Sequence, residues 1–279
     1  MAHDASSAAQ KERALAAWLA GRGRVAIGFS GGVDSAYLAV VARNTLGTDG
    51  VLAIIGRSAS YPAAQWAAAR RVADEFEVPV LELDTEELAD PRYAANPSNR
   101  CYFCKTELWG KLVPVARARG FGVVVDGTNA DDLGDYRPGA KAARENDVLS
   151  PLAELGFTKD DIRERSRALG LPTWRQPSSP CLSSRLPYGT SVTVERLAQV
   201  ERAEAALREL GIEGDLRVRF HGDLARLELA PDAVAQWLSP ERASAILHAV
   251  REAGFERVAL DLCGFRSGSL NILHGVTAA

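Results

Sequence analysis

One stretch of the sequence decides the fold: Val25-Ala26-Ile27-Gly28-Phe29-Ser30-Gly31-Gly32-Val33-Asp34-Ser35-Ala36. Its apolar beginning, Val25 to Phe29, predicts a buried strand. The break at Ser30-Gly31-Gly32, followed by apolar residues with helical spacing, predicts a helix directly after it. Adjacent glycines let backbone amides approach an anion closely, and a new helix adds unpaired N–H groups and the positive end of its dipole. The stretch therefore predicts a strand, a loop and a helix that together bind phosphate.

The side chains of this loop, residues 30–35, suit a phosphate cradle. Ser30 and Ser35 add hydroxyl donors, and Asp34 can hold a divalent cation carried by the phosphates. A Walker loop is excluded, because no Gly-Lys-Ser/Thr ends the stretch. The alternative is an ordinary glycine-rich turn, which the string Ser-Gly-Gly-Val-Asp-Ser in this context disfavours. The string resembles the pyrophosphate loop of the PP-loop ATPases, which cleave ATP between the α and β phosphates and adenylate a substrate.

Length and composition set the broad class. The 279 residues are long enough for a sizeable core and favour two domains. With 33 basic and 36 acidic residues the net charge is −3, which lacks the basic footprint of a nucleic-acid binder. Residues 1–10 do not resemble a signal peptide, and no apolar run approaches the ~18 residues of a membrane span. We therefore expect a cytoplasmic protein without nucleic-acid or membrane partners, whose four cysteines are reduced ligands or reactive thiols.

Apolar runs alternate with helical patterns around the phosphate cradle. Strands are expected at 51–55, 79–83 and 121–126, and helices at 8–20 and from Pro62 to Phe76. The alternation predicts an α/β fold with a doubly wound parallel sheet, which binds ligands at the carboxyl ends of its strands. Gly127, Thr128 and Asn129 follow the fourth strand, so they are predicted to face the nucleotide. A simple turn is the alternative for these three residues.

The composition changes at residues 176–180, a polar, proline-rich segment that predicts a linker. It divides the chain into a nucleotide domain, residues 1–176, and a second domain, residues 177–279. The second part carries a helical pattern at 192–210, strand patterns at 216–220, 224–229 and 258–262, and helical patterns within 231–253. This order predicts a smaller α+β domain.

Cys101 and Cys104 open a helical pattern, so both sulfurs are expected on one helix face, within reach of one metal or cluster. Arg100, Lys105 and the helix N-terminus would favour thiolates. A lone Cys-x-x-Cys is only moderately specific. It leaves a zinc half-site, a redox pair and two buried structural thiols open.

The other two cysteines differ in their surroundings. Cys181 lies in a loop of serines with Arg185, which predicts an exposed thiol made acidic by that arginine. Cys263 falls in an expected strand and is interpreted as structural. Asp261 and Arg266, on either side of Cys263, are expected to form a structural ion pair.

Arg217 and Arg219 alternate with apolar residues, so both guanidinium groups are expected to leave one face of a strand about 7 Å apart. Such a pair can bind a phosphate or carboxylate bidentately. The alternative is a solvated strand face whose arginines pair with acidic neighbours such as Glu228.

The phosphate cradle, the segment from Cys181 to Gly189 and the Arg217-Val218-Arg219 strand together resemble the LarE family over nearly the whole chain. These ATP-dependent sulfur transferases make the thiocarboxylates of the nickel-pincer cofactor of lactate racemase. The resemblance implies pyridinium-3,5-biscarboxylate mononucleotide as substrate, ATP and Mg²⁺ as cofactors, and assembly into a homo-oligomer. It also implies roles for particular residues: Ser30, Gly31, Gly32, Asp34 and Ser35 bind the phosphates and Mg²⁺, Ser58 lies near the adenosine, and Arg217, Arg219 and Glu204 contact the substrate.

The resemblance leaves two sulfur sources open. In one version of the family, the cysteine matching Cys181 attacks the acyl-adenylate and is sacrificed, becoming dehydroalanine. In the other version, it joins the Cys-x-x-Cys pair to hold a [4Fe–4S] cluster whose fourth iron carries an extra sulfide. Because Cys101, Cys104 and Cys181 are all present, the cluster version is the hypothesis we favour.

Three other functions compete with this interpretation. A tRNA thiolase shares PP-loops and paired cysteines, but the net charge of −3 argues against it. An amidation enzyme like NAD or GMP synthetase shares the cradle but does not explain Cys181. A non-enzymatic nucleotide sensor is disfavoured by the intact Asp34 and Ser35.

Overall fold

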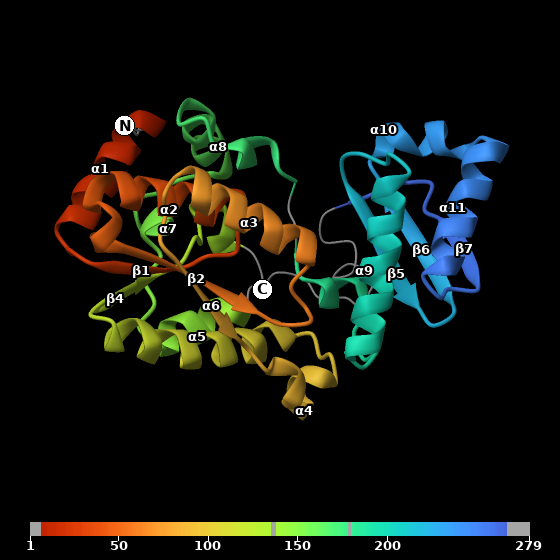
Figure 1. The fold of residues 1–279 in the computed structure, drawn as a ribbon, viewed down its shortest axis with the longest axis horizontal. Coiled ribbons are helices and arrows are strands. Elements are labelled where there is room, and N and C mark those ends of the chain that lie inside the picture. The colour runs from red at the N-terminus through yellow and green to blue at the C-terminus, as the bar shows by residue number, and fades with distance from the viewer. Residues whose placement is uncertain (1–6, 135–137, 178–179, 267–279) are drawn as a thin grey trace.

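Four parallel strands, in the order β3-β2-β1-β4, form the larger of two sheets in the computed structural model, which describes residues 7–134, 138–177 and 180–266 (Figure 1). Val25 of the central strand β1 lies opposite Val51 of β2 and Val123 of β4. The strands are β1 (Val25–Gly28), β2 (Val51–Arg57), β3 (Val80–Asp84) and β4 (Val123–Val125). The predicted α/β fold with a parallel sheet is confirmed.

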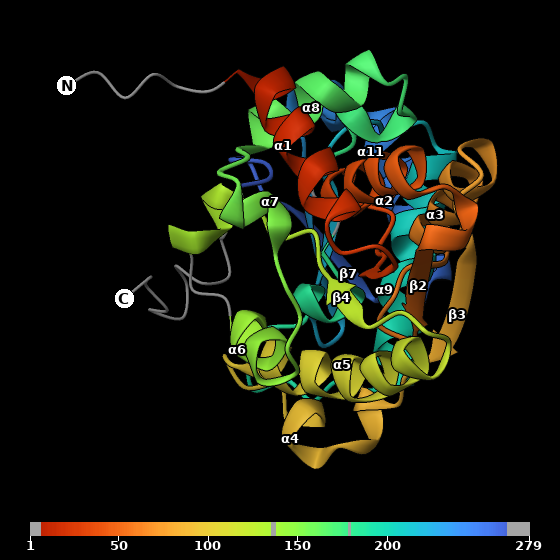
Figure 2. The ribbon, with the colours of Figure 1, turned by 90° about the vertical axis from the view of Figure 1, so that its left-hand side faces the viewer.

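Helices cover both faces of this sheet, as parallel sheets require (Figure 2). Alternate residues of β1 serve the two faces: Val25 and Ile27 pack into one core, and Ala26 into the other. The first face carries α1 (Ala8–Ala20), α2 (Val33–Leu46), α3 (Ala63–Glu75) and α8 (Lys159–Ala168), and the second carries α5 (Arg100–Ala118) and α6 (Pro138–Glu145). Two short helices, α4 (Pro91–Ala94) and α7 (Pro151–Glu154), complete this lobe.

The strand order places the ligand-binding edge between β1 and β4. The chain runs from β1 to β2 and β3 on one side and then returns to β4 on the other side. At such a switch point the loops after the two strands diverge and leave a crevice at the carboxyl edge of the sheet. The phosphate cradle follows β1 and residues 127–129 follow β4, so both predicted nucleotide segments lie at this edge.

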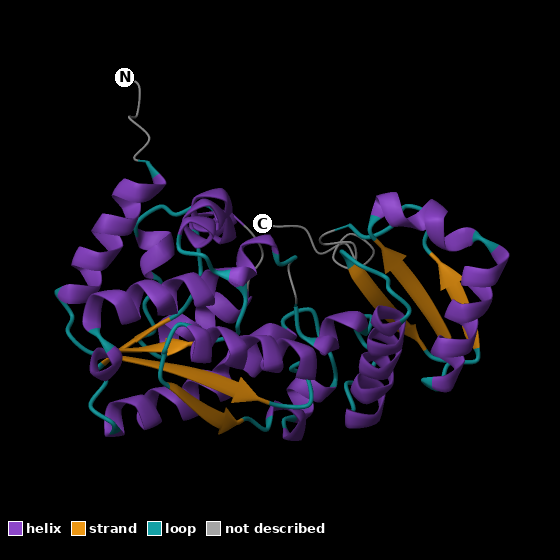
Figure 3. Cartoon of the chain, turned by 45° about the horizontal axis from the view of Figure 1, so that its top comes forward, coloured by secondary structure: helices purple, strands orange, loops and turns teal. Residues whose placement is uncertain are grey.

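A second sheet forms the C-terminal lobe (Figure 3). Its strand β5 (Leu216–His221) is antiparallel to β6 (Leu224–Leu229), which is parallel to β7 (Arg257–Leu260). The helices of this lobe are α9 (Val194–Glu209), α10 (Pro231–Val234) and α11 (Pro240–Glu252), and α11 provides the crossover that a parallel pair needs. The predicted α+β character of this part is confirmed. The domain boundary at 176/177 stays a prediction, and residues 178–179 of the expected linker lie outside the described residues.

Two expectations near the end of β7 are wrong. The strand ends at Leu260, because a turn follows in which Gly264 donates to the Asp261 carbonyl with a φ of 67°. Cys263 therefore lies outside the strand and is exposed. Asp261 pairs with Arg226 of the neighbouring strand at 2.5 Å, rather than with Arg266.

No helix in the ranges 7–134, 138–177 and 180–266 is long and apolar enough to cross a membrane.

Candidate functional site

The phosphate cradle is held in an open conformation by its own hydroxyl groups. The Ser30 N–H donates to Ser35 Oγ at 3.3 Å, and Ser35 Oγ donates to the Gly32 carbonyl at 3.2 Å. Gly31 has a φ of 69°, and a Cβ there would lie 2.4 Å from the Cβ of Ala69 in α3. Only glycine fits this close approach, so the backbone amides between β1 and α2 remain accessible to an anion.

The outer wall of the cradle is fixed by α3 and the segment before it. The Tyr61 hydroxyl and the Gln65 side-chain amide both donate to the Ser30 carbonyl at 2.9 Å. These bonds turn the carbonyl outward and away from the cradle, so that a phosphate there would meet donors.

Asp34 lies in the first turn of α2 and has two partners that the sequence interpretation missed. Lys159 Nζ, from the start of α8, lies 2.5 Å from Asp34 Oδ2, and Asn129 Nδ2 donates to Asp34 Oδ1 at 3.3 Å. The cradle has no basic residue of its own, so the sequence indicates that a cation from another element is needed to balance the phosphates. Nothing in the sequence pattern selects Lys159 among the others.

Gly127 brings the loop after β4 against the cradle. A Cβ on Gly127 would lie 2.9 Å from the Ser35 nitrogen and 3.2 Å from its Cα, so the two backbones touch. Thr128 donates through its N–H and its hydroxyl to Asp126, at 3.1 and 3.0 Å. Gly127 thus lies beside the cradle, whereas the Thr128 side chain is turned toward its own strand end.

Ser58 connects the nucleotide edge with the cysteine-bearing segment. Its hydroxyl donates to Glu87 Oε1 at 2.5 Å, and Ser60 Oγ donates to the same oxygen at 2.7 Å. The Ser60 carbonyl in turn accepts from the Leu182 N–H at 2.8 Å. The sequence interpretation missed Glu87, a buried carboxylate. It holds Ser58 and Ser60, which follow β2, and Ser60 in turn binds Leu182, the residue after Cys181.

The three site cysteines interact electrostatically. Cys101 and Cys104 lie in the first turns of α5, and Cys181 precedes the short 3₁₀ helix Leu182–Arg185. Burial raises the pKa of the Cys104 thiol, and the negative charge of Glu87 raises it further. Within the described part of the chain, no three His, Cys, Asp or Glu side chains are placed to hold a single metal ion.

Arg100 and Lys105 are cations near these sulfurs. The buried guanidinium of Arg100 donates to the Ser183 carbonyl at 2.9 Å. Burial alone would lower the pKa of Arg100, but negative charge on Cys181 and Cys101 outweighs it and raises the pKa above the ordinary value. The nearby cations lower the pKa of these thiols, but not enough to offset the opposing effects, so the predicted preference for thiolates is not met at Cys104.

Arg185 has an ion-pair partner that the sequence did not predict. It pairs bidentately with Glu204, at 2.9 and 3.0 Å, and donates to the carbonyl oxygens of Pro180 and Cys181 at 2.6 and 3.2 Å. Its guanidinium binds the backbone around Cys181 instead of facing the thiol. Glu204 of α9 thus holds the Arg185 side chain. The acidification of Cys181 by Arg185 stays a prediction.

Arg217 and Arg219 leave one face of β5, but both are buried. Arg219 pairs with Glu228 at 2.7 Å and donates to the Ser184 carbonyl at 2.9 Å. Burial, and then the charge of Arg185, lower the pKa of Arg217 to about 10. The pairing with Glu228 that the alternative interpretation expected is present, whereas the solvation that it expected is not.

Three guanidinium groups, those of Arg185, Arg217 and Arg219, thus gather beside the segment that follows Cys181. Like charges held together in a buried place favour an anion between them. The predicted roles of Arg217, Arg219 and Glu204 toward a substrate remain predictions.

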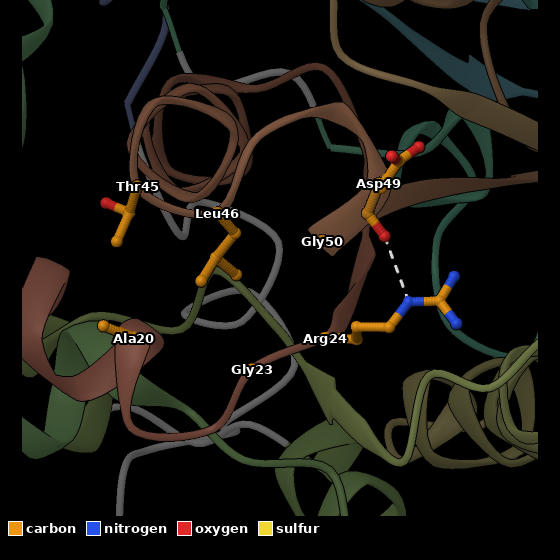
Figure 4. Close-up of a pocket in the computed structure, with 7 residues that line it drawn as sticks. All are labelled: Ala20, Gly23, Arg24, Thr45, Leu46, Asp49 and Gly50. Carbon is orange, nitrogen blue, oxygen red and sulfur yellow. Dashed lines mark hydrogen bonds between the residues drawn. The ribbon is translucent and has the colours of Figure 1, made fainter.

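A hollow of about 700 Å³ lies at the opposite, amino edge of the large sheet (Figure 4). There Arg24 Nε donates to the Asp49 carbonyl at 3.0 Å, and its guanidinium stacks on Phe121 at 4.2 Å. The hollow is lined by Ala20, Gly23, Arg24, Thr45, Leu46, Asp49 and Gly50, none of which belongs to the cradle. It is not the nucleotide site.

Comparison with known proteins agrees with this geometry. Residues 18–99, which include the cradle, match the model of the NAD synthase family. The chain is 46% identical over 248 residues to an uncharacterized protein of Synechocystis sp., covering 89% of this chain and 92% of that protein. It is 37% identical over 263 residues to the pyridinium-3,5-bisthiocarboxylic acid mononucleotide synthase of Lactiplantibacillus plantarum, covering 94% of each. The chain therefore belongs to the LarE-like PP-loop family and is an ATP-dependent enzyme.

Proposed function

We propose that this enzyme activates the carboxylates of pyridinium-3,5-biscarboxylic acid mononucleotide with ATP and converts them to thiocarboxylates. The similarity to the Lactiplantibacillus plantarum synthase supports the substrate. One structural observation carries the proposal. The segment after Cys181 is bonded at Leu182 to the nucleotide edge, through Ser60, and at Ser184 to Arg219. A thiol between an ATP cradle and an arginine cluster suits sulfur transfer to an anionic, adenylated substrate.

In the proposed reaction, a substrate carboxylate attacks the α-phosphorus of ATP, forming an acyl-adenylate and releasing pyrophosphate. The backbone amides of Gly31 and Gly32 and the hydroxyls of Ser30 and Ser35 would bind the phosphates, and Asp34 would hold Mg²⁺. Neutralising the developing charge makes pyrophosphate a viable leaving group. Ser58 and the loop carrying Gly127 and Thr128 would border the adenosine and the α-phosphate.

The arginine cluster would orient the substrate. Arg217 and Arg219 would bind its phosphate, whose negative charge would offset the burial and the repulsion from Arg185 that lower the Arg217 pKa. Glu204, which already fixes Arg185 and accepts from the Val218 N–H at 3.0 Å, would keep the guanidinium groups in place. In this way the carboxylate to be activated is directed toward the cradle.

The sulfur source in our proposal is a [4Fe–4S] cluster held by Cys101, Cys104 and Cys181. Two thiols in the first turns of α5, and a third at the start of the segment to which Arg100 is bonded, suit such a cluster. When bound, the cluster would supply an open iron for an exchangeable sulfide. Sacrifice of Cys181 is the competing source.

Intact mass after one anaerobic turnover, with iron and sulfide analysis before it, separates the two sources. We expect an unchanged mass, about four irons per chain and a thiolated product. A loss of about 34 Da at Cys181 would instead mean sacrificial transfer. Cys101→Ala and Cys104→Ala should abolish the iron, whereas Cys263→Ala, at the one cysteine outside the proposed ligand set, should not. Absence of any thiocarboxylate product would refute the proposed function.

We further propose that the enzyme is cytoplasmic and forms a homo-oligomer. All four cysteines are free thiols, which suits a reducing compartment. Light scattering coupled to gel filtration tests the assembly, and a monomeric mass would contradict it.

A further inference from the structure

ATP brings several negative charges to a cradle that has no cation of its own. Between Arg24 and Arg43 the sequence contains neither lysine nor arginine. In a Walker loop, a lysine within the loop reaches the β and γ phosphates. Here a positive charge for the departing pyrophosphate has to come from another element.

Lys159 is the lysine that contacts a cradle carboxylate. Its Nζ lies 2.5 Å from Asp34 Oδ2, and the two side chains keep 36% and 22% of their exposure. Ligands and ions in solution therefore have access to this pair. Asn129 holds the other oxygen of Asp34 at 3.3 Å, so the carboxylate stays in place if the lysine leaves.

The backbone of Lys159 is held firmly while its side chain is long and flexible. Lys159 is the first residue of α8, which lies beside α2 (Figure 1), and its N–H donates to Asp131 Oδ2 at 2.7 Å. Thr158 and Asp161 form a capping box at this helix start, and Lys11 Nζ binds Asp161 at 2.6 Å. The helix thus holds the backbone of Lys159 near the cradle, while the side chain can still move its ammonium group from one partner to another.

We propose that Lys159 is an exchangeable cation. In the nucleotide-free enzyme it occupies Asp34. When Mg²⁺ arrives with ATP and takes that carboxylate, the ammonium group moves to the adjacent phosphates and stabilises the leaving pyrophosphate. This is an exchange of ionic contacts, with no covalent bond made or broken at Lys159. The inference rests on the proposed cleavage of ATP at this cradle and is independent of which carboxylate is adenylated.

The exchange predicts opposite effects on metal binding and on catalysis. In Lys159→Met, Asp34 is no longer occupied, so Mn²⁺ should bind the nucleotide-free enzyme about 3- to 5-fold more tightly, the strength of an exposed ion pair. Pyrophosphate release from ATP should fall about 100-fold, as for other lost transition-state donors. Lys159→Arg keeps the charge and should lose less activity. Mn²⁺ binding is followed by electron paramagnetic resonance of the free ion.

Lys11→Met is the matched control. Lys11 also anchors α8 through an ion pair but does not contact Asp34, so its loss should change neither Mn²⁺ affinity nor pyrophosphate release per folded molecule. If Lys159 only anchored the helix, both variants would behave alike, and Mn²⁺ binding in Lys159→Met would be unchanged or weaker. That result would overturn the inference.

A measurement on the wild-type enzyme covers the case in which Lys159→Met does not fold. Acylation of Lys159, mapped by mass spectrometry, is compared with and without Mg²⁺ and α,β-methylene-ATP. Protection by the metal and analogue together, but not by the analogue without metal, supports the exchange, and no change overturns it. A protected Lys159 in an enzyme that fails to thiolate the pyridinium substrate would reject the proposed function and support the role of the lysine.

Discussion

At the scale of single residues, the close contact between Gly127 and α2 makes a sharp prediction. In Gly127→Ala, the new Cβ would lie 2.9 Å from the Ser35 nitrogen, and backbone cannot yield as a flexible side chain can. Overpacking of this kind costs about 1–3 kcal/mol. We expect the free energy of unfolding to fall by that amount in urea, and binding of α,β-methylene-ATP to weaken, because the displaced atoms belong to the cradle.

Gly122→Ala supplies the control, because nothing lies within 4 Å of a Cβ at that position. Its stability and nucleotide binding should match the wild type. Equal behaviour of the two variants would contradict the close approach at Gly127.

At the scale of elements, the N-terminus of α8 depends on Asp161. Its Oδ2 accepts hydrogen bonds from Lys11 Nζ at 2.6 Å and from the N–H and hydroxyl of Thr158, both at 2.8 Å. Asp161→Asn removes the charge and part of this capping, so we expect a loss of about 1–2 kcal/mol in the free energy of unfolding. Asp160→Asn, one residue earlier in the same turn and exposed, should cost far less.

The Asp161 contribution should depend on pH. Burial alone would raise the pKa of the Asp161 carboxyl, but the bonds from Lys11 and Thr158 hold it below the ordinary value of 3.8. A carboxyl with a lowered folded-state pKa stabilises the fold fully above the unfolded pKa, and the stabilisation is lost as the pH falls through the folded pKa. The stability gap between wild type and Asp161→Asn should therefore be constant near pH 7 and narrow below about pH 3.8. A gap that widens in acid would contradict this assignment.

At the scale of the whole molecule, the sequence predicted what is encoded locally. The cradle, the first turns of α5 and the alternation in β5 were all expected, because each is a short motif whose spacing implies its geometry. Partners from distant elements were not predicted. Lys159 pairs with Asp34 from 125 positions away, and Glu204 pairs with Arg185. Neither contact produces a periodic pattern in the sequence, so neither could be predicted from it. The reactive residues of the site can be identified from the sequence, whereas their ionic partners depend on the tertiary structure.

Tyr93 is a buried contact between the N-terminal lobe and the core of the C-terminal lobe. Tyr93 lies in α4 of the N-terminal lobe, is 1% exposed, and packs in the core cluster of the C-terminal lobe with Leu182 and Leu186. Its hydroxyl lies 2.6 Å from Ser183 Oγ. Because Tyr93 packs between the lobes, the unfolding of one lobe is expected to destabilise the other. Tyr93 also contacts the segment after Cys181.

Tyr93→Phe removes only the hydrogen bond and should cost about 1 kcal/mol. Tyr93→Ala also leaves a cavity, for which about 3–5 kcal/mol is typical of a buried aromatic ring. We therefore expect wild type and Tyr93→Phe to unfold in one transition, and Tyr93→Ala to unfold in two, because the packing of α4 against the C-terminal core is lost. Tryptophan fluorescence and circular dichroism during urea unfolding distinguish these cases. Tyr102→Phe, which loses an exposed hydroxyl bond to Glu145 at 2.7 Å, is the control and should resemble the wild type. A single, unshifted transition for Tyr93→Ala would show that the lobes are coupled through other contacts.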